Sequence, residues 1–396
     1  MRSFMSCIAA YCEDSAMQKC SLDRNLMRSI ARLLKCTMLL GMFILLTKPA
    51  TAQTNVSAYW LDGNGSWGDP GSWSTATVPN NSSAFLYNVS IDPSTNSTVG
   101  LSGIDSGSAI VSTLNLGTQA ALNVFPGRLD VLGTLRNKGS VTVGGSSLSA
   151  GVLDNCGSLF LGQATVTAGE LRNNGSTTVA DAQLIVNGNI VNSGSVNINA
   201  SIMSATGNLT NTGSISGSGA IPSSVSVGGN LNNSGSLSVS QNFSWNVGGS
   251  MHNSGSLEML GSVNAASFSQ SASGNLLEQF MSGSVFGVLD VAGSLNLAGT
   301  LDFGLLGGYM VSLGDTFIIA NFAPGQLTGG FSALLHNSFN NGLEMFDIDY
   351  DNAGGHLLLS VVSPPPTPTP EPGTWALFIV GIPVALIAKR RYGVSQ

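Results

Sequence analysis

The chain has 396 residues, only 9% of them charged, with 50 glycines, a hydrophobic content of 43% and a formal net charge of −7. An average soluble domain is about 25% charged, so this composition excludes a charged disordered tail and a coiled coil. The acidic balance argues against a nucleic-acid partner. The composition favours a β-rich body outside the cytoplasm, with a length that suits two or three domains.

Residues 27–52 have the pattern of a signal peptide. Its parts follow in order: the basic residues Arg28, Arg32 and Lys35, the mostly apolar stretch 36–46, and Ala50 and Ala52 as the A-x-A cleavage pair. The apolar stretch is too short to span a membrane. We therefore predict that the secretion machinery exports the chain and that cleavage follows Ala52. Residues 1–26 lack such a pattern, so we expect Met27 to be the initiator and residues 1–26 to be an over-called start.

Residues 53–126 are predicted to form an N-terminal cap and the first strands. Trp60, Trp67 and Trp73 lie there among Gly, Asp and Pro turns. The repeats that follow need such a cap, because an open end exposes core and strand edges to water. Tryptophans can also stack on sugar rings, but capping is the interpretation that we favour.

Residues 127–286 contain seven copies of the pattern G-x-(L/I/M)-x-N-x-G-S. They begin at Gly133, Gly151, Gly169, Gly188, Gly207, Gly229 and Gly249, and a degenerate eighth copy begins at Gly287. Spacings of 18 to 22 residues and a fixed Asn-x-Gly turn are typical of the coils of a parallel β-helix. We therefore predict an all-β solenoid of about 19-residue coils, whose equivalent positions stack every ~4.8 Å.

This stacking predicts ladders to which each coil adds one rung. The third position of each copy and the residue after its serine should form two apolar ladders in the core. The asparagines should stack their amides, each donating to a carbonyl of the next coil; they are Asn137, Asn155, Asn173, Asn192, Asn211, Asn233 and Asn253. The glycines from Gly139 to Gly255 occupy a turn where we expect positive φ, and the serines beside them are expected to continue the polar ladder. The repeats are thus predicted to be architecture rather than chemistry.

The fourth position of the first copies carries charges of alternating sign. Arg136, Asp154 and Arg172 should stand one coil apart on an outer line. We predict a surface ion ladder, which contributes little to stability. A polysaccharide contact is the alternative for this line.

Residues 287–362 are predicted to form further strands and a distal cap. Asp347, Asp349 and Asp351 form the densest acidic set of the chain. Alternation along a strand puts all three on one face of a C-terminal hairpin, where solvation explains them.

The C-terminal end combines a spacer with an apolar segment. Residues 363–372 read SPPPTPTPEP, which predicts an extended polyproline II spacer. Residues 375–388 are apolar and are predicted to be a single transmembrane helix, although 14 residues are few for one. The membrane-stop residues Lys389, Arg390 and Arg391 would keep the C-terminus in the cytoplasm.

The order of these parts resembles the PEP-CTERM sorting signal of Gram-negative bacteria. The resemblance covers residues 370–396 and depends on the sorting motif Pro370, Glu371 and Pro372 before an apolar helix and a basic cluster. It implies recognition by an integral-membrane exosortase, a transient stay in the inner membrane and removal of the tail. It also implies a final place at the cell surface or in the extracellular matrix, with exopolysaccharide as a partner. A permanent C-terminal anchor is the alternative.

Two further resemblances concern the body. Residues 60–81 resemble the opening module of bacterial secreted β-helical proteins and autotransporter-like passengers. The 19-residue period resembles filamentous-haemagglutinin-type adhesin repeats. Both imply a structural or adhesive role.

A search for chemistry finds no catalytic, cofactor-binding or metal-binding pattern. Cys156 alone follows the cleavage site, and its variable turn position predicts an exposed, incidental thiol. The three histidines lack metal-ligand spacing. A polysaccharide-degrading enzyme needs converging carboxylates, but the acids are spread thinly. We therefore predict a structural or adhesive surface protein that is not an enzyme and needs no cofactor or metal. A carbohydrate-binding module and a β-helical polysaccharide-degrading enzyme are the alternatives.

Overall fold

A computed structural model describes residues 52–102, 104, 107–219 and 222–365. Residues 1–51, which include most of the predicted signal peptide, lie outside this part. So do residues 366–396, which include most of the spacer, the sorting motif and the predicted helix over 375–388. Within the described residues, no helix has the length and apolar character needed to cross a membrane.

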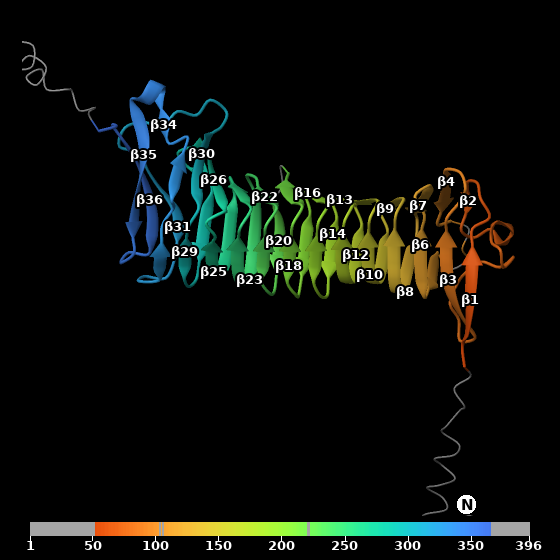
Figure 1. Cartoon of the computed structure of the whole chain (residues 1–396). Helices are drawn as coiled ribbons and strands as arrows, with labels where there is room; N and C mark the ends of the chain where they lie inside the picture. Colours follow the sequence, from red (N-terminus) through yellow and green to blue (C-terminus); the bar gives the residue numbers. More distant parts are fainter. Residues whose placement is uncertain (1–51, 103, 105–106, 220–221, 366–396) are drawn as a thin grey trace, which may run out of the picture. The chain divides into compact units, whose positions relative to one another are not determined.

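The described part is all-β, and its helices are two single 3₁₀ turns, η1 (Pro70–Ser72) and η2 (Asn340–Gly342). Its strands build a parallel β-solenoid of about nine turns from β8 to β30. Figure 1 shows these strands side by side in chain order. The predicted solenoid is confirmed, and parallel pairing continues outside residues 127–286 on both sides.

Each turn contributes a strand segment to each of three faces. Face 1 contains β5 (Ser108–Val111), β14 (Gln183–Val186), β17 (Ile202–Ala205), β20 (Ser223–Val227), β28 (Val288–Val291), β31 (Thr316–Asn321) and the first halves of five long strands. The long strands are β8 (Arg128–Asn137), β10 (Ser147–Asn155), β12 (Thr165–Asn173), β23 (Phe243–Asn253) and β25 (Ser262–Gln270). Four of them bend near the first glycine of the repeat and β25 bends near Ala266, so their second halves belong to face 2.

Faces 2 and 3 complete each turn. Face 2 also contains β3 (Phe85–Ile91), β6 (Thr113–Leu116), β15 (Ile190–Asn192), β18 (Leu209–Asn211), β21 (Leu231–Asn233), β29 (Leu295–Leu297) and β32 (Leu327–Gly329), with β1 (Thr54–Tyr59) beside β3. Face 3 is a separate sheet. It contains β2 (Gly65–Ser66), β4 (Ser97–Gly100), β7 (Ala120–Val124), β9 (Ser140–Gly144), β11 (Ser158–Gly162), β13 (Ser176–Ala180), β16 (Ser195–Asn199), β19 (Ser214–Ser218), β22 (Ser236–Val239), β24 (Ser256–Met259), β26 (Asn275–Ser282), β30 (Thr300–Leu305) and β33 (Ala333–Leu335); β27 (Val285–Phe286) pairs with β26.

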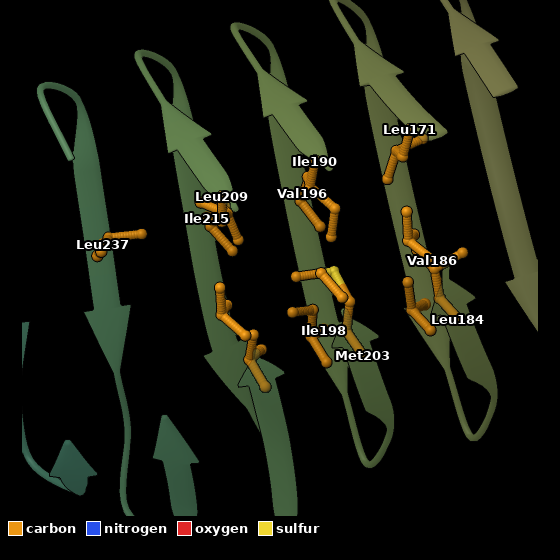
Figure 2. Packing of buried hydrophobic residues seen from close by; sticks show 14 of the residues in the cluster. Leu171, Leu184, Val186, Ile190, Val196, Ile198, Met203, Leu209, Ile215 and Leu237 are labelled. Atoms are coloured by element: carbon orange, nitrogen blue, oxygen red, sulfur yellow. The ribbon is translucent and has the colours of Figure 1, made fainter. Parts of the chain in front are cut away.

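The core lies between the three faces, because alternate residues of each strand point inward. Figure 2 shows Leu184 and Met203 of face 1 and Ile190 of face 2 pointing into the same interior as Val196 and Leu237 of face 3. None of these side chains is more than 1% exposed. Both predicted apolar ladders are confirmed, and burying each such side chain contributes roughly 1.5–3 kcal/mol.

The turn glycines have a different role from the one predicted. Gly139, Gly157, Gly175 and their equivalents are absent from the residues with positive φ. Their constraint is steric: a Cβ on Gly175 would overlap the carbonyl oxygen of Gly157 in the preceding coil. Glycine is therefore needed because successive coils touch backbone to backbone at this turn, and the expected left-handed conformation is wrong.

The degenerate copy at Gly287 is also placed differently. Leu289 should occupy the third position of a repeat, on face 2, but it pairs with Val263 on face 1. The true third-position rungs after Met251 are Phe268 and Leu295. The resemblance at Gly287 arises because faces 1 and 2 carry the same alternation of apolar and outward residues.

The tryptophans close the N-terminal end. Trp60, Trp67 and Trp73 are at most 6% exposed and pack edge to face, with ring centroids 4.9–5.0 Å apart. Their indole N–H groups donate to the carbonyls of Gly63, Pro79 and Trp67, respectively. The predicted cap is confirmed, and such buried rings offer no face to a sugar.

The other end is closed by antiparallel strands and phenylalanines. β34 (Ser338–Phe339), β35 (Glu344–Asp351) and β36 (His356–Val362) form an antiparallel unit that pairs with β31. Phe346 of β35 is fully buried and contacts the rings of Phe280, Phe303 and Phe317. The distal cap is thus an aromatic cluster under a hairpin.

Replacing a turn glycine tests the steric constraint. We expect Gly175→Ala to destabilise the solenoid by about 1–3 kcal/mol, because the added Cβ overpacks two backbones. Gly144→Ala is the matched control, since its Cβ would lie 3.9 Å from the Phe125 ring, an ordinary contact. Thermal and urea midpoints of both variants measure the effect. Equal midpoints for the two variants would contradict the steric explanation.

Candidate functional site

The sequence-predicted residues fall into two groups. Ala50, the sorting motif at 370–372 and the membrane-stop residues at 389–391 lie outside the described residues, and Ala52 is an exposed residue at the start of that part. The seven repeat asparagines are all described. The atoms of the predicted ladder are therefore all placed.

The asparagine amides form one continuous chain of hydrogen bonds along the solenoid. From Asn137 to Asn233, each Nδ2 donates to Oδ1 of the asparagine in the next coil over 2.7–2.8 Å. The same nitrogen donates to the backbone carbonyl of the serine that follows the turn of the next coil, over 2.8–3.1 Å. All seven side chains are at most 1% exposed. The two amide hydrogens and the oxygen of each inner rung are thus satisfied within the protein.

The ladder starts after an apolar residue and ends in a glutamine. Leu116 precedes Asn137 in the register, and Oδ1 of Asn137 accepts no hydrogen bond. At the other end Asn253 donates to Oε1 of Gln270, whose Nε2 donates to the carbonyls of Ala298 and Thr300. The repeat pattern does not extend to Gln270, because glutamine replaces asparagine and the turn glycine is displaced to Gly274.

The serines beside the turn do not continue this ladder through their hydroxyl groups. Their side chains are exposed or half-buried on face 3. Their backbone carbonyls accept the asparagine amides instead. Serine at this position thus leaves a hydroxyl-bearing outer surface.

The predicted ion ladder forms only in part. Arg136 Nε lies 2.9 Å from Asp154 Oδ2 in the next coil. Arg172 is in register with Asp154 but pairs with Glu170, two residues earlier on its own strand, at 2.8 Å. The hydrogen bond from Arg172 to Glu170 and the negative charge of Glu170 raise the pKa of Arg172 above its usual value. Glu170 was not part of the predicted ladder because it occupies the second position of its repeat, not the fourth.

The remaining reactive groups do not converge. Cys156 is an exposed free thiol, as predicted. Within the described part of the chain, no three His, Cys, Asp or Glu side chains gather as a metal site would require. The side chains of Asp347, Asp349 and Asp351 are exposed on one side of β35, as their spacing predicts.

Glu278 is a charged residue type at a core position. It occupies a rung of face 3 between Met259 and Phe303 and is fully buried. Neither carboxyl oxygen has a hydrogen-bond partner. The nearby amide of Gly287 donates to the carbonyl of Gln279 instead. Burial raises the pKa of Glu278 well above its usual value, and the smaller effect of the Gly287 amide is in the opposite direction.

An open groove runs along the corner between faces 1 and 2 over five successive coils. Its volume is about 720 Å³. The residue at the corner is small in each of these coils: Gly228, Gly248, Ala266, Ala292 and Ala323. In the two coils before, Asn187 and Thr206 occupy this position. We call this hollow the corner groove, and it exists because side chains are missing from one line of the solenoid.

A line of polar side chains forms one wall of the corner groove. This outer polar row consists of Ser226, Asn246, Asn264, Asp290 and Asn321, which are neighbours in the parallel register. Asn264 donates to Oδ1 of Asn246 over 3.1 Å, and Asn321 donates to Oδ1 of Asp290 over 2.6 Å. The repeat pattern does not mark this row, although the alternation of the strands that carry it places its positions outward.

Comparisons with known proteins add no assignment. No protein-family model matches the chain, and no curated protein matches its sequence. The function is therefore inferred from the solenoid, the corner groove and the predicted terminal signals.

Removing one inner rung tests the asparagine ladder. Asn192→Ala deletes an amide that joins Asn173 to Asn211, and leaves one amide hydrogen of Asn173 and Oδ1 of Asn211 without a partner. We expect a loss of roughly 2–4 kcal/mol, because each buried unsatisfied group costs about 1–3 kcal/mol. The control is Asn232→Ala, an exposed outward residue, which should change stability by less than about 0.5 kcal/mol. Urea unfolding followed by circular dichroism distinguishes the two. A loss no greater than in the control would contradict the ladder's contribution.

Replacing Glu278 tests the cost of its burial. A folded-state pKa raised above the unfolded value means that the folded chain keeps a proton which the unfolded chain releases. Stability should then fall as pH rises above ~4.3, by up to about 1.4 kcal/mol per pH unit until the folded-state pKa is reached. Glu278→Gln removes this dependence, so its melting midpoint should exceed that of the natural chain more at pH 8 than at pH 4.

A second variant separates charge from shape at this position. Glu278→Met, which repeats the Met259 rung, should show the same flattened pH dependence as Glu278→Gln. Melting curves between pH 4 and pH 8 provide the measurement. Parallel pH profiles of the natural chain and both variants would show that the carboxyl group does not cause the effect.

Proposed function

We propose that this chain is an exported structural or adhesive protein of the cell surface or extracellular matrix. The observation that carries the proposal is the unbroken asparagine ladder. A repeat whose residues satisfy one another along the axis makes a stiff rod and leaves the outer surface to meet other molecules. We assign the protein no catalytic role, cofactor or metal.

The signals at the two ends supply the route in this proposal. The leader over 27–52 directs the chain through the secretion machinery. The Pro370-Glu371-Pro372 motif is recognised by an exosortase while residues 375–388 hold the chain transiently in the inner membrane. Removal of the tail then releases the solenoid. The charge distribution supports this: seven basic residues precede Gln53 and three end the apolar segment, whereas residues 53–362 keep only four.

The mature ends of the protein test this route. We expect mass spectrometry of the released protein to show an N-terminus at Gln53 and a C-terminus that lacks Lys389, Arg390 and Arg391. Glu371→Ala should leave the tail in place and the protein in the membrane fraction, as should deletion of the exosortase. Pro365→Ala, which changes the spacer outside the motif, serves as the control and should be processed normally. A released protein with an intact tail would overturn the sorting proposal.

A further inference from the structure

We propose that the corner groove binds an extended, uncharged polysaccharide whose chain lies along the solenoid axis. This inference deepens the proposed adhesive role by naming its ligand and the place where it binds. Because binding is measured with the purified protein, the result does not depend on whether the proposed sorting route is correct.

The outer polar row leaves donors and acceptors available at regular intervals. After the hydrogen bonds within the row, Asn246 keeps its Nδ2 donor, Asn264 keeps its Oδ1 acceptor, and Asp290 keeps Oδ2. Successive coils space these atoms by about 4.8 Å. A ligand that meets both donors and acceptors along such a line needs groups that both donate and accept. Hydroxyl groups do so, and a chain of sugar rings carries them on every ring.

The floor of the groove suits a ring rather than a branched side chain. Backbone and methyl groups of Gly248, Ala266 and Ala292 form a smooth strip, and all three residues are exposed. Phe322, which is 6% exposed and belongs to the core, lies directly beneath this strip. Ligand sites commonly combine such an apolar surface with a few polar groups that fix orientation. The C–H faces of sugar rings can lie on the strip while their hydroxyls reach the outer polar row.

Charge excludes a polyanionic ligand. Residues 173–362 contain no lysine or arginine but ten acidic residues, and the groove wall itself carries Asp290. An acidic polymer would meet repulsion here with no basic side chain to pair with. The proposed ligand is therefore an uncharged polysaccharide.

An extended peptide fits less well. A peptide strand binds through the free edge of a sheet, but the strands that carry the wall of the groove pair with a neighbour on both sides. Its backbone groups also recur every ~3.3 Å, out of step with the coil spacing. Peptide binding is accordingly an alternative outcome of the test.

Affinity electrophoresis of the full chain in mild detergent tests the proposal. The probes are three soluble neutral polymers, namely hydroxyethylcellulose, mixed-linkage β-glucan and galactomannan. Carboxymethylcellulose serves as the acidic counterpart of the first. We expect retardation by at least one neutral polymer and weaker retardation by the acidic one. Added salt should reduce this difference, because it screens charge.

Two groove variants locate the binding. Ala266→Trp fills the groove from an exposed position, and Asn246→Ala with Asn264→Ala removes hydrogen bonds from the wall. Each should weaken binding by roughly tenfold, with unchanged melting midpoints. Asn232→Ala, an exposed asparagine on the neighbouring face of the same coils, should bind like the natural chain.

Several results would overturn the proposal. These are no retardation by any neutral polymer, equal retardation of Ala266→Trp and the natural chain, or tighter binding of the acidic polymer. Displacement of the polymer from the groove by a proline-rich peptide, but not by oligosaccharides, would assign the groove to a peptide. Correct processing of the mature ends alongside any of these results would leave the export proposal standing.

Discussion

The requirement that buried amides be hydrogen-bonded governs the architecture of this protein. An asparagine side chain has two donor hydrogens and an acceptor oxygen, and in a dry core each must find a partner. The repeat meets this need only when the next coil places another asparagine at the same point, one strand spacing away. The asparagine ladder therefore fixes the register of every coil between Asn137 and Gln270. A coil that slipped by one residue would leave two amides unsatisfied.

This constraint acts at one turn and leaves the rest of the coil free. Asn211 and Asn233 are 22 residues apart, three more than the preceding pair, and the additional residues lie in the turn between β19 and β20. The turn that carries asparagine and glycine keeps its length, because the glycine backbones of successive coils touch there. Length variation is thus directed to the other turn and to the corner between faces 1 and 2, and sequence variation to the outward positions. The corner groove and Glu278 both occur in the later coils, where the pattern becomes irregular.

The parts of the fold that were predictable share a property. The third-position residues and the asparagines recur at fixed spacing, so their common environment follows from stacking alone. The N-terminal cap was predictable because any stack needs its ends covered. The φ angles of Gly139 and Gly157 were not predictable. A glycine can be needed either for a left-handed turn or for close contact between two backbones, and the sequence does not distinguish the two. The pattern at Gly287 misled for a related reason: two faces of the coil alternate in the same way, and only pairing distinguishes them.

The sequence by itself determined the export and sorting signals as predictions, the β-helical class, and the amide and apolar ladders. These features depend on the order of neighbouring residues or on residues that recur at a regular spacing. The tertiary structure decided which residues meet outside the repeat pattern: Arg172 with Glu170 on its own strand, the phenylalanines around Phe346, and Asn246 with Asn264 and Asp290 across coils. It also decided that Glu278 faces the core. None of these contacts recurs at a fixed spacing, so only the folded chain shows which residues meet.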